Sequence, residues 1–146
     1  QEAGLTSLYF YPLQPYEKMS ALLATADIHL VLQKKSASDL VLPSKLTGIL
    51  AAGGCAIVTA VEGTTLYDIV KKHRVGILCE PESRKDLYKS IQIALSIDQS
   101  EIKANARFYA TQFLSKESVL QSFTANLNAL QNKALVEVQE SVTIGS

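Results

Sequence analysis

Residues 39–60 read DLVLPSKLTGILAAGGCAIVTA, and this stretch decides the fold. It combines a helical pattern over Leu46–Ala52, a glycine pair at Gly53-Gly54 that suits a helix end, and an apolar run at Ala56–Val61. The run is apolar on both faces, as is typical of a strand in a parallel sheet that helices cover from both sides. The stretch therefore predicts a helix that leads into a buried parallel strand.

The same alternation of short apolar runs and helical patterns continues outward from this stretch. The expected strands are Leu8–Tyr11 (LYFY), Ile28–Leu32, Ala56–Val61 and Val75–Cys79. The expected helices are Tyr16–Ala26, Leu46–Ala52, Thr65–His73 and Lys85–Ser96, with Ser83 as the cap of the last. Strand–helix alternation implies parallel crossovers, so we predict a Rossmann-like, doubly wound α/β domain of about four strands.

After Asp98 the pattern becomes purely helical, with expected helices over Ile102–Phe113 and Lys116–Gln131. We therefore predict one domain over residues 1–133, in which residues 98–133 form a helical arm, followed by a tail at 134–146. The apolar residues of the tail share one parity between Val136 and Ile144, which favours a strand, but Glu140 interrupts that face. A strand and a frayed tail therefore both fit the tail.

Composition narrows the classes of partner. The chain has 146 residues, enough for one domain, with 14 basic and 14 acidic side chains. A balanced charge gives no global field that would draw the chain to nucleic acid or to a membrane surface. A local anion site stays compatible with this composition.

Cysteine usage and hydropathy indicate a cytoplasmic protein without a structural metal. Cys55 and Cys79 lie in apolar runs and have no metal-ligand or redox spacing, so they are expected to be buried free thiols. No signal peptide opens the chain, and no apolar run approaches the ~18 residues of a membrane span.

The loop that precedes the helix of residues 46–52 is the first candidate site, because ligands of open parallel sheets bind at the carboxyl ends of strands. Pro43 suits a first helical turn, whose free N–H groups attract anions. Ser44 adds a hydroxyl and Lys45 a positive charge, so the segment could hold a diphosphate. The alternative is that Ser44 caps the helix and Lys45 is a solvated surface charge.

This stretch and its surroundings resemble the donor-binding half of retaining glycosyltransferases with two Rossmann-like domains (the GT-B architecture, family 4). The colanic-acid-type exopolysaccharide glycosyltransferases are the most similar group. The resemblance rests on the LPSKL…ILA.GG segment and on three flanking segments: YPLQPYEKMSALLATADIHLVL, GILCEPESRKDLYKSIQIAL and ANARFYATQFLSKESVLQSF. It implies binding of a nucleoside-diphosphate sugar without a metal or another cofactor, and transfer of the sugar to a saccharide or lipid-linked acceptor.

The resemblance also implies positions for the donor. It places the diphosphate over Pro43, Ser44 and Lys45, and the base or sugar near Leu13, Gln14, Tyr16, Glu80 and Glu82. Asp39 becomes the candidate for a sugar-facing catalytic acid. From the residues alone, Tyr16 could instead pack at the start of its helix, and Glu80 and Glu82 could simply belong to a helix-initiating turn.

One position departs from the family pattern. Family members carry a glutamate in the helix after this loop that reaches the nucleotide ribose, and Gly48 stands at that position here. The carboxylate clamp on the ribose is therefore absent, which leaves the catalytic competence and the donor open.

The resemblance further implies that the chain is a fragment. Two strands of the parent sheet and the acceptor-binding domain would precede Gln1, so the isolated chain is expected to be inactive. The missing strands would leave an open sheet edge through which the chain could self-associate. In the full-length enzyme the protein could lie against the inner membrane.

Two other functions remain open at this point. A non-catalytic regulatory module, similar to a response regulator, would need an acidic pocket at the early strands, where Asp27 is the only acid. A fragment without any activity is the other. His29, which alternates within a buried strand, is expected to be a core residue with its hydrogen bonds satisfied.

Overall fold

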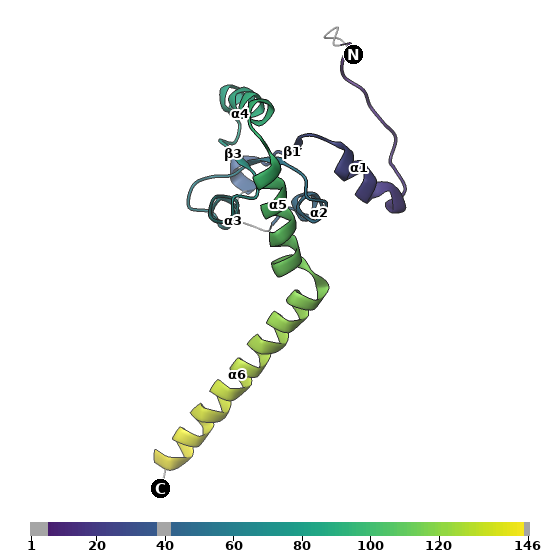
Figure 1. Ribbon diagram of the computed structural model, residues 1–146. Helices are drawn as coiled ribbons and strands as arrows, with labels where there is room; N and C mark the ends of the chain where they lie inside the picture. Colours follow the sequence, from purple (N-terminus) through teal and green to yellow (C-terminus); the bar gives the residue numbers. More distant parts are fainter. Residues whose placement is uncertain (1–5, 38–41, 145–146) are drawn as a thin grey trace.

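The computed structural model describes residues 6–37 and 42–144, with side chains up to residue 131 (Figure 1). Its centre is a parallel sheet in the order β1-β2-β3, formed by β1 (His29–Val31), β2 (Ala56–Thr59) and β3 (Ile77–Cys79). His29 stands opposite Ala56, and Ile57 stands opposite Ile77. The predicted Rossmann-like α/β class is confirmed.

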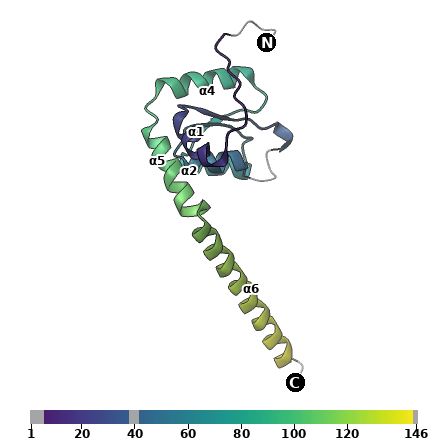
Figure 2. The same ribbon diagram turned by 90° about the vertical axis from the view of Figure 1, so that its right-hand side faces the viewer.

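Helices cover both faces of the sheet, which explains why its strands are mostly apolar (Figures 1 and 2). The crossover helices α2 (Ser44–Ala51) and α3 (Thr65–His73) share one core with α5 (Ser100–Tyr109). Helix α4 (Arg84–Ser96) packs on the other face against β2 and β3.

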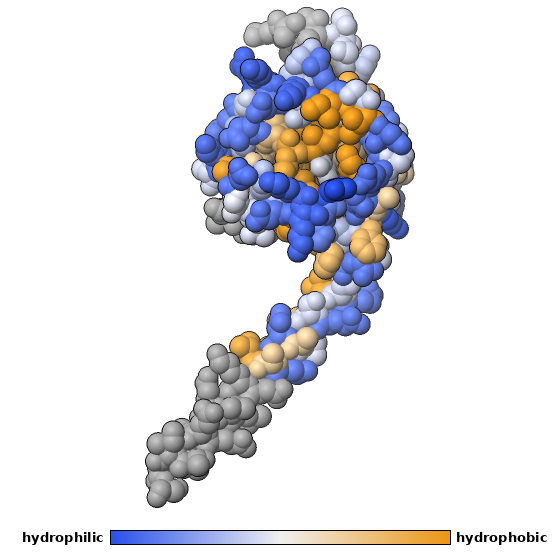
Figure 3. Space-filling model, turned by 60° about the vertical axis from the view of Figure 1, so that its left-hand side comes forward, coloured by the Kyte–Doolittle hydropathy of each residue, from blue (hydrophilic) through white to orange (hydrophobic). Residues whose placement is uncertain are grey.

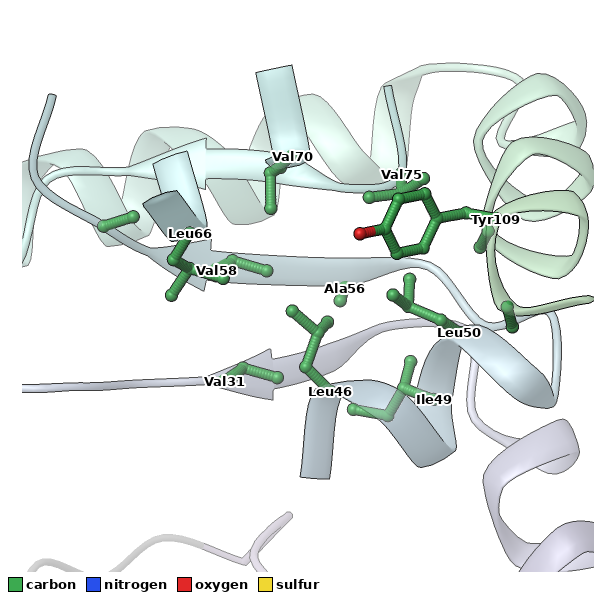
Figure 4. Close-up of a cluster of buried hydrophobic side chains, with 13 residues drawn as sticks. Val31, Leu46, Ile49, Leu50, Ala56, Val58, Leu66, Val70, Val75 and Tyr109 are labelled. Atoms are coloured by element: carbon green, nitrogen blue, oxygen red, sulfur yellow. The ribbon is translucent and has the colours of Figure 1, made fainter. Parts of the chain in front are cut away.

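The larger core lies between the sheet and the helices α2, α3 and α5 (Figure 4). Val58 and Ala56 of the central strand point into it, whereas Ile57 points into the core under α4. Other members of the larger core are Val31, Leu46, Ile49, Leu50, Leu66, Val70, Val75 and Tyr109. All residues of β2 are buried, so the central strand holds the two layers together.

Two predicted helix boundaries follow from local hydrogen bonds. Helix α2 ends in a Schellman motif, in which the Gly54 N–H donates to Ile49 O (2.9 Å) and the Gly53 N–H to Leu50 O (3.0 Å). Gly53 has a φ of +68°, a left-handed conformation that glycine adopts without steric cost. Helix α4 begins behind Ser83, whose Oγ accepts the Asp86 N–H at 3.2 Å.

The N-terminal segment differs from the prediction. Residues 8–11 form no strand and are exposed, with Phe10 83% exposed, so the sheet of the described residues has three strands rather than four. A strand needs a neighbour for its backbone groups and a core for its side chains, and this aromatic run has neither among the described residues. The helix expected over residues 16–26 is present as a 3₁₀ turn, Tyr16–Lys18, followed by α1 (Met19–Thr25).

The helical arm is confirmed. A π-helical turn, Ala110–Leu114, links α5 to α6 (Lys116–Ile144), which extends away from the α/β unit (Figures 1 and 2). The strand considered for residues 136–144 is wrong, because the helix of the arm runs on through these residues. A backbone already in a helix adds each further hydrogen bond at little entropic cost, which outweighs a short alternation of valines.

Apolar residues also remain on the outside of the molecule. They gather in one area of the α/β unit that hydrophilic residues surround, and further apolar residues lie along the arm (Figure 3). Exposed examples on α6 are Val119, Leu120, Phe123, Leu127 and Leu130. In the described residues, no helix is both long and apolar enough to span a bilayer.

Candidate functional site

The carboxyl ends of the three strands meet at one edge of the sheet and border a cavity of about 300 Å³. The N-terminus of α4 closes its other side. Its lining residues are Leu32, Gln33, Lys34, Thr59, Cys79, Glu80, Glu82, Ser83, Arg84 and Leu87. This is the edge at which open α/β sheets bind ligands.

Thr59 joins two strand ends beneath this cavity. Its Oγ1 accepts the Gln33 N–H at 2.6 Å and donates to the Gln33 carbonyl at 3.0 Å. The hydroxyl thereby satisfies both backbone groups of a residue that has left the sheet ladder. The chain after β1 is fixed at this point, although the loop that it begins is long.

The turn after β3 forms one rim of the cavity, as the sequence predicts. Glu80 and Glu82 both line it, and Pro81 between them is buried. Glu82 has a φ of +62°, a left-handed conformation that costs a non-glycine residue about 1–2 kcal/mol. Lys34 and Arg84 add two cationic side chains to the same lining.

Cys79 lines the cavity as well, but its thiol is a poor nucleophile. Burial raises the pKa of Cys79, while a hydrogen bond with Ser90 opposes this shift. Burial raises the pKa of Cys55 too. Both thiols therefore stay protonated at neutral pH, consistent with the expected buried free thiols.

The predicted diphosphate segment, Pro43–Lys45, stands at the start of α2 and at the same edge of the sheet. Pro43 is the residue that caps the helix, and its carbonyl accepts the N–H groups of Leu46 (2.9 Å) and Thr47 (3.2 Å). No described residue accepts a hydrogen bond from the N–H groups of Ser44 and Lys45. The alternative in which the Ser44 side chain caps the helix is wrong, because no side-chain cap is present.

Lys45 lies against the outer edge of β1. Its Nζ donates to the carbonyl oxygen of Leu30 at 2.9 Å, and its side chain is exposed. An ammonium group has three donors, so two remain for an anion at this edge. The contact also covers a carbonyl that no described strand pairs with.

Other predicted residues do not join the cavity. Leu13 and Tyr16 are 95% and 87% exposed, so Tyr16 does not pack in the core, and neither residue belongs to the lining of the cavity. The Gln14 Nε2 donates to Pro12 O at 2.9 Å, within its own loop. Asp39 lies outside the described residues.

Gly48 faces helix α1 and not the cavity. A Cβ built on Gly48 would lie 3.4 Å from Leu23 Cδ1, which is an ordinary contact distance. His29 of β1 is buried, and its Nε2 donates to the Leu23 carbonyl at 2.8 Å. The predicted core role of His29 is confirmed, and α1 is thereby held next to α2.

The acid that a regulatory module would need does not lie at the carboxyl edge of the sheet, where ligands bind. Asp27 precedes β1 and lies at the amino end of the sheet, beside Gln99 and Lys103. The described residues contain no group of His, Cys, Asp and Glu side chains that could hold a metal ion.

Comparison with known proteins gives one informative relative. Over 124 residues, 84% of this chain, the sequence is 44% identical to the colanic acid biosynthesis glycosyltransferase WcaI of Escherichia coli strain K12. The chain spans 30% of the length of that protein. No protein-family model matches the chain, and no solved structure gives a significant match. The identity confirms the resemblance to the colanic-acid-type glycosyltransferases, and the chain is a glycosyltransferase-like segment.

Proposed function

We propose that this relative of colanic-acid-type glycosyltransferases forms the donor-binding part of a sugar transferase. It would hold a nucleoside-diphosphate sugar at the carboxyl edge of its sheet. The full-length protein would transfer the sugar to a saccharide or lipid-linked acceptor. We further propose a GT-B architecture with retention at the anomeric carbon, with the acceptor site in the part of the protein outside this chain.

The observation that carries the proposal is the position of the cavity. It lies where three parallel strands end and where α4 begins, and the N-terminus of α2 stands at the same edge. A nucleotide sugar needs an anion site next to a pocket for a ring that carries hydroxyl groups. The start of α2 would supply the first and the cavity the second, both at the carboxyl edge of the sheet.

The diphosphate would lie over Ser44 and Lys45. Their N–H groups point along the positive end of the α2 dipole, and the Lys45 ammonium adds a full charge. When the bond between sugar and phosphate breaks, negative charge grows on the departing diphosphate. Donors fixed in advance stabilise that charge, which lowers the barrier.

The sugar would lie toward the rim formed by Glu80 and Glu82. Carboxylates accept hydrogen bonds from hydroxyl groups, and both side chains line the cavity. Asp39 as the sugar-facing acid remains part of the proposal. The same holds for a base-binding role of the loop at Leu13, Gln14 and Tyr16.

Replacing Lys45 with alanine in the full-length protein is expected to weaken nucleotide-sugar binding by about 1–3 kcal/mol, the range for a charge-assisted hydrogen bond. Isothermal titration calorimetry with a panel of UDP- and GDP-sugars measures this change. Lys45→Arg, which keeps the charge, should retain most of the affinity.

The matched control is Lys72→Ala. Lys72 is also an exposed lysine, but it lies in the last turn of α3 at the opposite edge of the sheet. Its removal should leave the affinity unchanged. An unchanged affinity for Lys45→Ala would remove Lys45 from the site, and equal losses in the two variants would point to a general charge effect.

We also propose that the isolated chain self-associates through the outer edge of β1. Leu30 is 37% exposed on this edge, and no described strand pairs with it. A second copy can supply partners for the backbone groups of this edge that Lys45 does not already cover. Static light scattering should give a mass above 15.9 kDa, and Leu30→Lys, which places a charge on the edge, should restore the monomer. A wild-type mass of one chain at high concentration would contradict this proposal.

A further inference from the structure

Gln33 carries an unexplained polar atom at the cavity. Its side-chain Oε1 is buried and has no hydrogen-bond partner, and it is the one such side-chain atom among the described residues. Buried polar groups in folded proteins are nearly always paired, so an exception requires a cause. Leaving a buried acceptor without a donor is destabilising, and an apolar side chain of the same shape would avoid that cost.

The backbone of Gln33 is fixed, so only its side chain can respond to a ligand. The Thr59 hydroxyl holds both the N–H (2.6 Å) and the carbonyl (3.0 Å) of Gln33. Gln33 itself lines the cavity. The terminal torsion of glutamine is broad and soft, so its carboxamide can turn toward the cavity while the backbone stays in place.

A second energetically unfavourable feature lies at the same cavity. Glu82, on the opposite rim, holds a left-handed backbone with a φ of +62° although it is not glycine. Strained backbone and unpaired polar groups persist where function requires them and the rest of the fold offsets their cost. The unpaired Oε1 of Gln33 and the strained backbone of Glu82 belong to residues that line the same cavity of about 300 Å³.

The lining of the cavity indicates which part of a nucleotide sugar it would take. The carboxylates of Glu80 and Glu82 are balanced by the cations of Lys34 and Arg84. A volume of about 300 Å³ is at the lower end for small-molecule sites, which suits a single ring. The lining carries no net charge and includes the apolar side chains of Leu32 and Leu87, so it suits an uncharged ring better than a diphosphate.

We propose that Gln33 is a specificity-determining residue whose side-chain oxygen accepts a hydrogen bond from a hydroxyl group of the donor sugar. The inference rests on the proposed donor-binding function and assigns the sugar part of the donor to this cavity. The bound hydroxyl supplies the donor that the folded chain lacks, so binding removes the cost of the unpaired atom.

The test replaces Gln33 with methionine, which has a similar shape but no strong hydrogen-bonding group, in the full-length protein. The probes are UDP-glucose, GDP-mannose and the parent diphosphates UDP and GDP, with affinities from calorimetry and the Tm from thermal unfolding. Gln33→Met should bind the nucleotide sugar about 3- to 10-fold more weakly and the parent diphosphate as tightly as wild type. Its Tm without ligand should equal or exceed that of wild type, because an unpaired polar atom has been removed.

Two further variants sharpen the result. Gln33→Glu keeps an acceptor oxygen at the position and should retain affinity for the sugar within about 3-fold. Gln112→Met makes the same substitution at an exposed glutamine of the arm and should change neither affinity nor Tm.

Three results would contradict the proposal, each for a different reason. Wild-type affinity for the nucleotide sugar in Gln33→Met would overturn the role of Gln33 and leave the donor site standing. Equal losses for the nucleotide sugar and its diphosphate would also overturn it, since the contact would not be to the sugar. Absence of binding to the wild-type protein would overturn the proposed function and this inference together.

Discussion

Gly76→Ala is expected to lower the stability of the chain by about 1–3 kcal/mol, the usual cost of forcing an extra methyl group into a packed site. A Cβ at Gly76 would lie 2.8 Å from the Ala56 carbonyl oxygen, a distance that side chains do not tolerate. That oxygen belongs to the central strand, which is fully buried between two helical layers. Neither strand can move aside without loss of core contacts, so the strain remains in the folded state.

Thermal or urea unfolding followed by circular dichroism measures this effect. For a chain of 146 residues, the loss corresponds to a decrease in Tm of roughly 3–10 °C. The control is Gly48→Ala, the same substitution in helix α2, where the new methyl group meets only Leu23 Cδ1 at 3.4 Å. Alanine favours a helix over glycine by up to about 1 kcal/mol, so Gly48→Ala should be as stable as wild type or more stable. Equal stability of the two variants would show that β3 packs more loosely than its contacts indicate.

The strands that the sequence predicts correctly are those whose side chains enter a core. The runs that form β2 and β3 send side chains into the cores on both faces, and β1 buries His29 and Val31, so their apolar character is visible without knowledge of the fold. Residues 8–11 are also rich in apolar and aromatic side chains but have no partner strand among the described residues, and composition cannot reveal a missing partner. The strand considered for residues 136–144 was wrong for a related reason, because α6 begins at Lys116 and continues through these residues.

A similar difference separates the site residues that the sequence predicts from those that it does not. The segment Pro43–Lys45 and the acids Glu80 and Glu82 could be placed from sequence because each lies between the end of a strand and the start of the next long helix, at the ligand edge. Gln33 and Thr59 were missed, although Gln33 directly follows one apolar run and Thr59 lies within another. Their hydrogen bonds join residues that are 26 positions apart, and such pairing is specified only by the register of β1 on β2. The orientation of Gly48 toward α1 was also beyond a linear pattern, because it depends on how two helices pack.

The 146-residue chain alone is expected to transfer no sugar, even when saturated with donor. Because it spans 30% of its glycosyltransferase relative, we propose that the remaining part supplies the acceptor site. Holding two reactants in a productive geometry can account for about 7–11 kcal/mol of a barrier. Loss of that positioning would reduce the rate by a factor of roughly 10⁵ to 10⁸ relative to the full-length protein, which is below detection in most transfer assays.

A chimaera distinguishes inactivity caused by a missing domain from inactivity caused by a defective donor-binding segment. The matched segment of this chain would replace the corresponding segment of the Escherichia coli relative, and sugar transfer would be assayed beside the isolated chain and the unchanged relative. Transfer by the chimaera, together with its loss in the isolated chain, is the expected result, since the graft restores positioning. A Lys45→Ala chimaera should fold like the parent chimaera and transfer more slowly, because the diphosphate loses a donor. Transfer by the isolated chain would show that both substrates bind within these 146 residues, and an inactive but folded chimaera would place the defect in the segment taken from this chain.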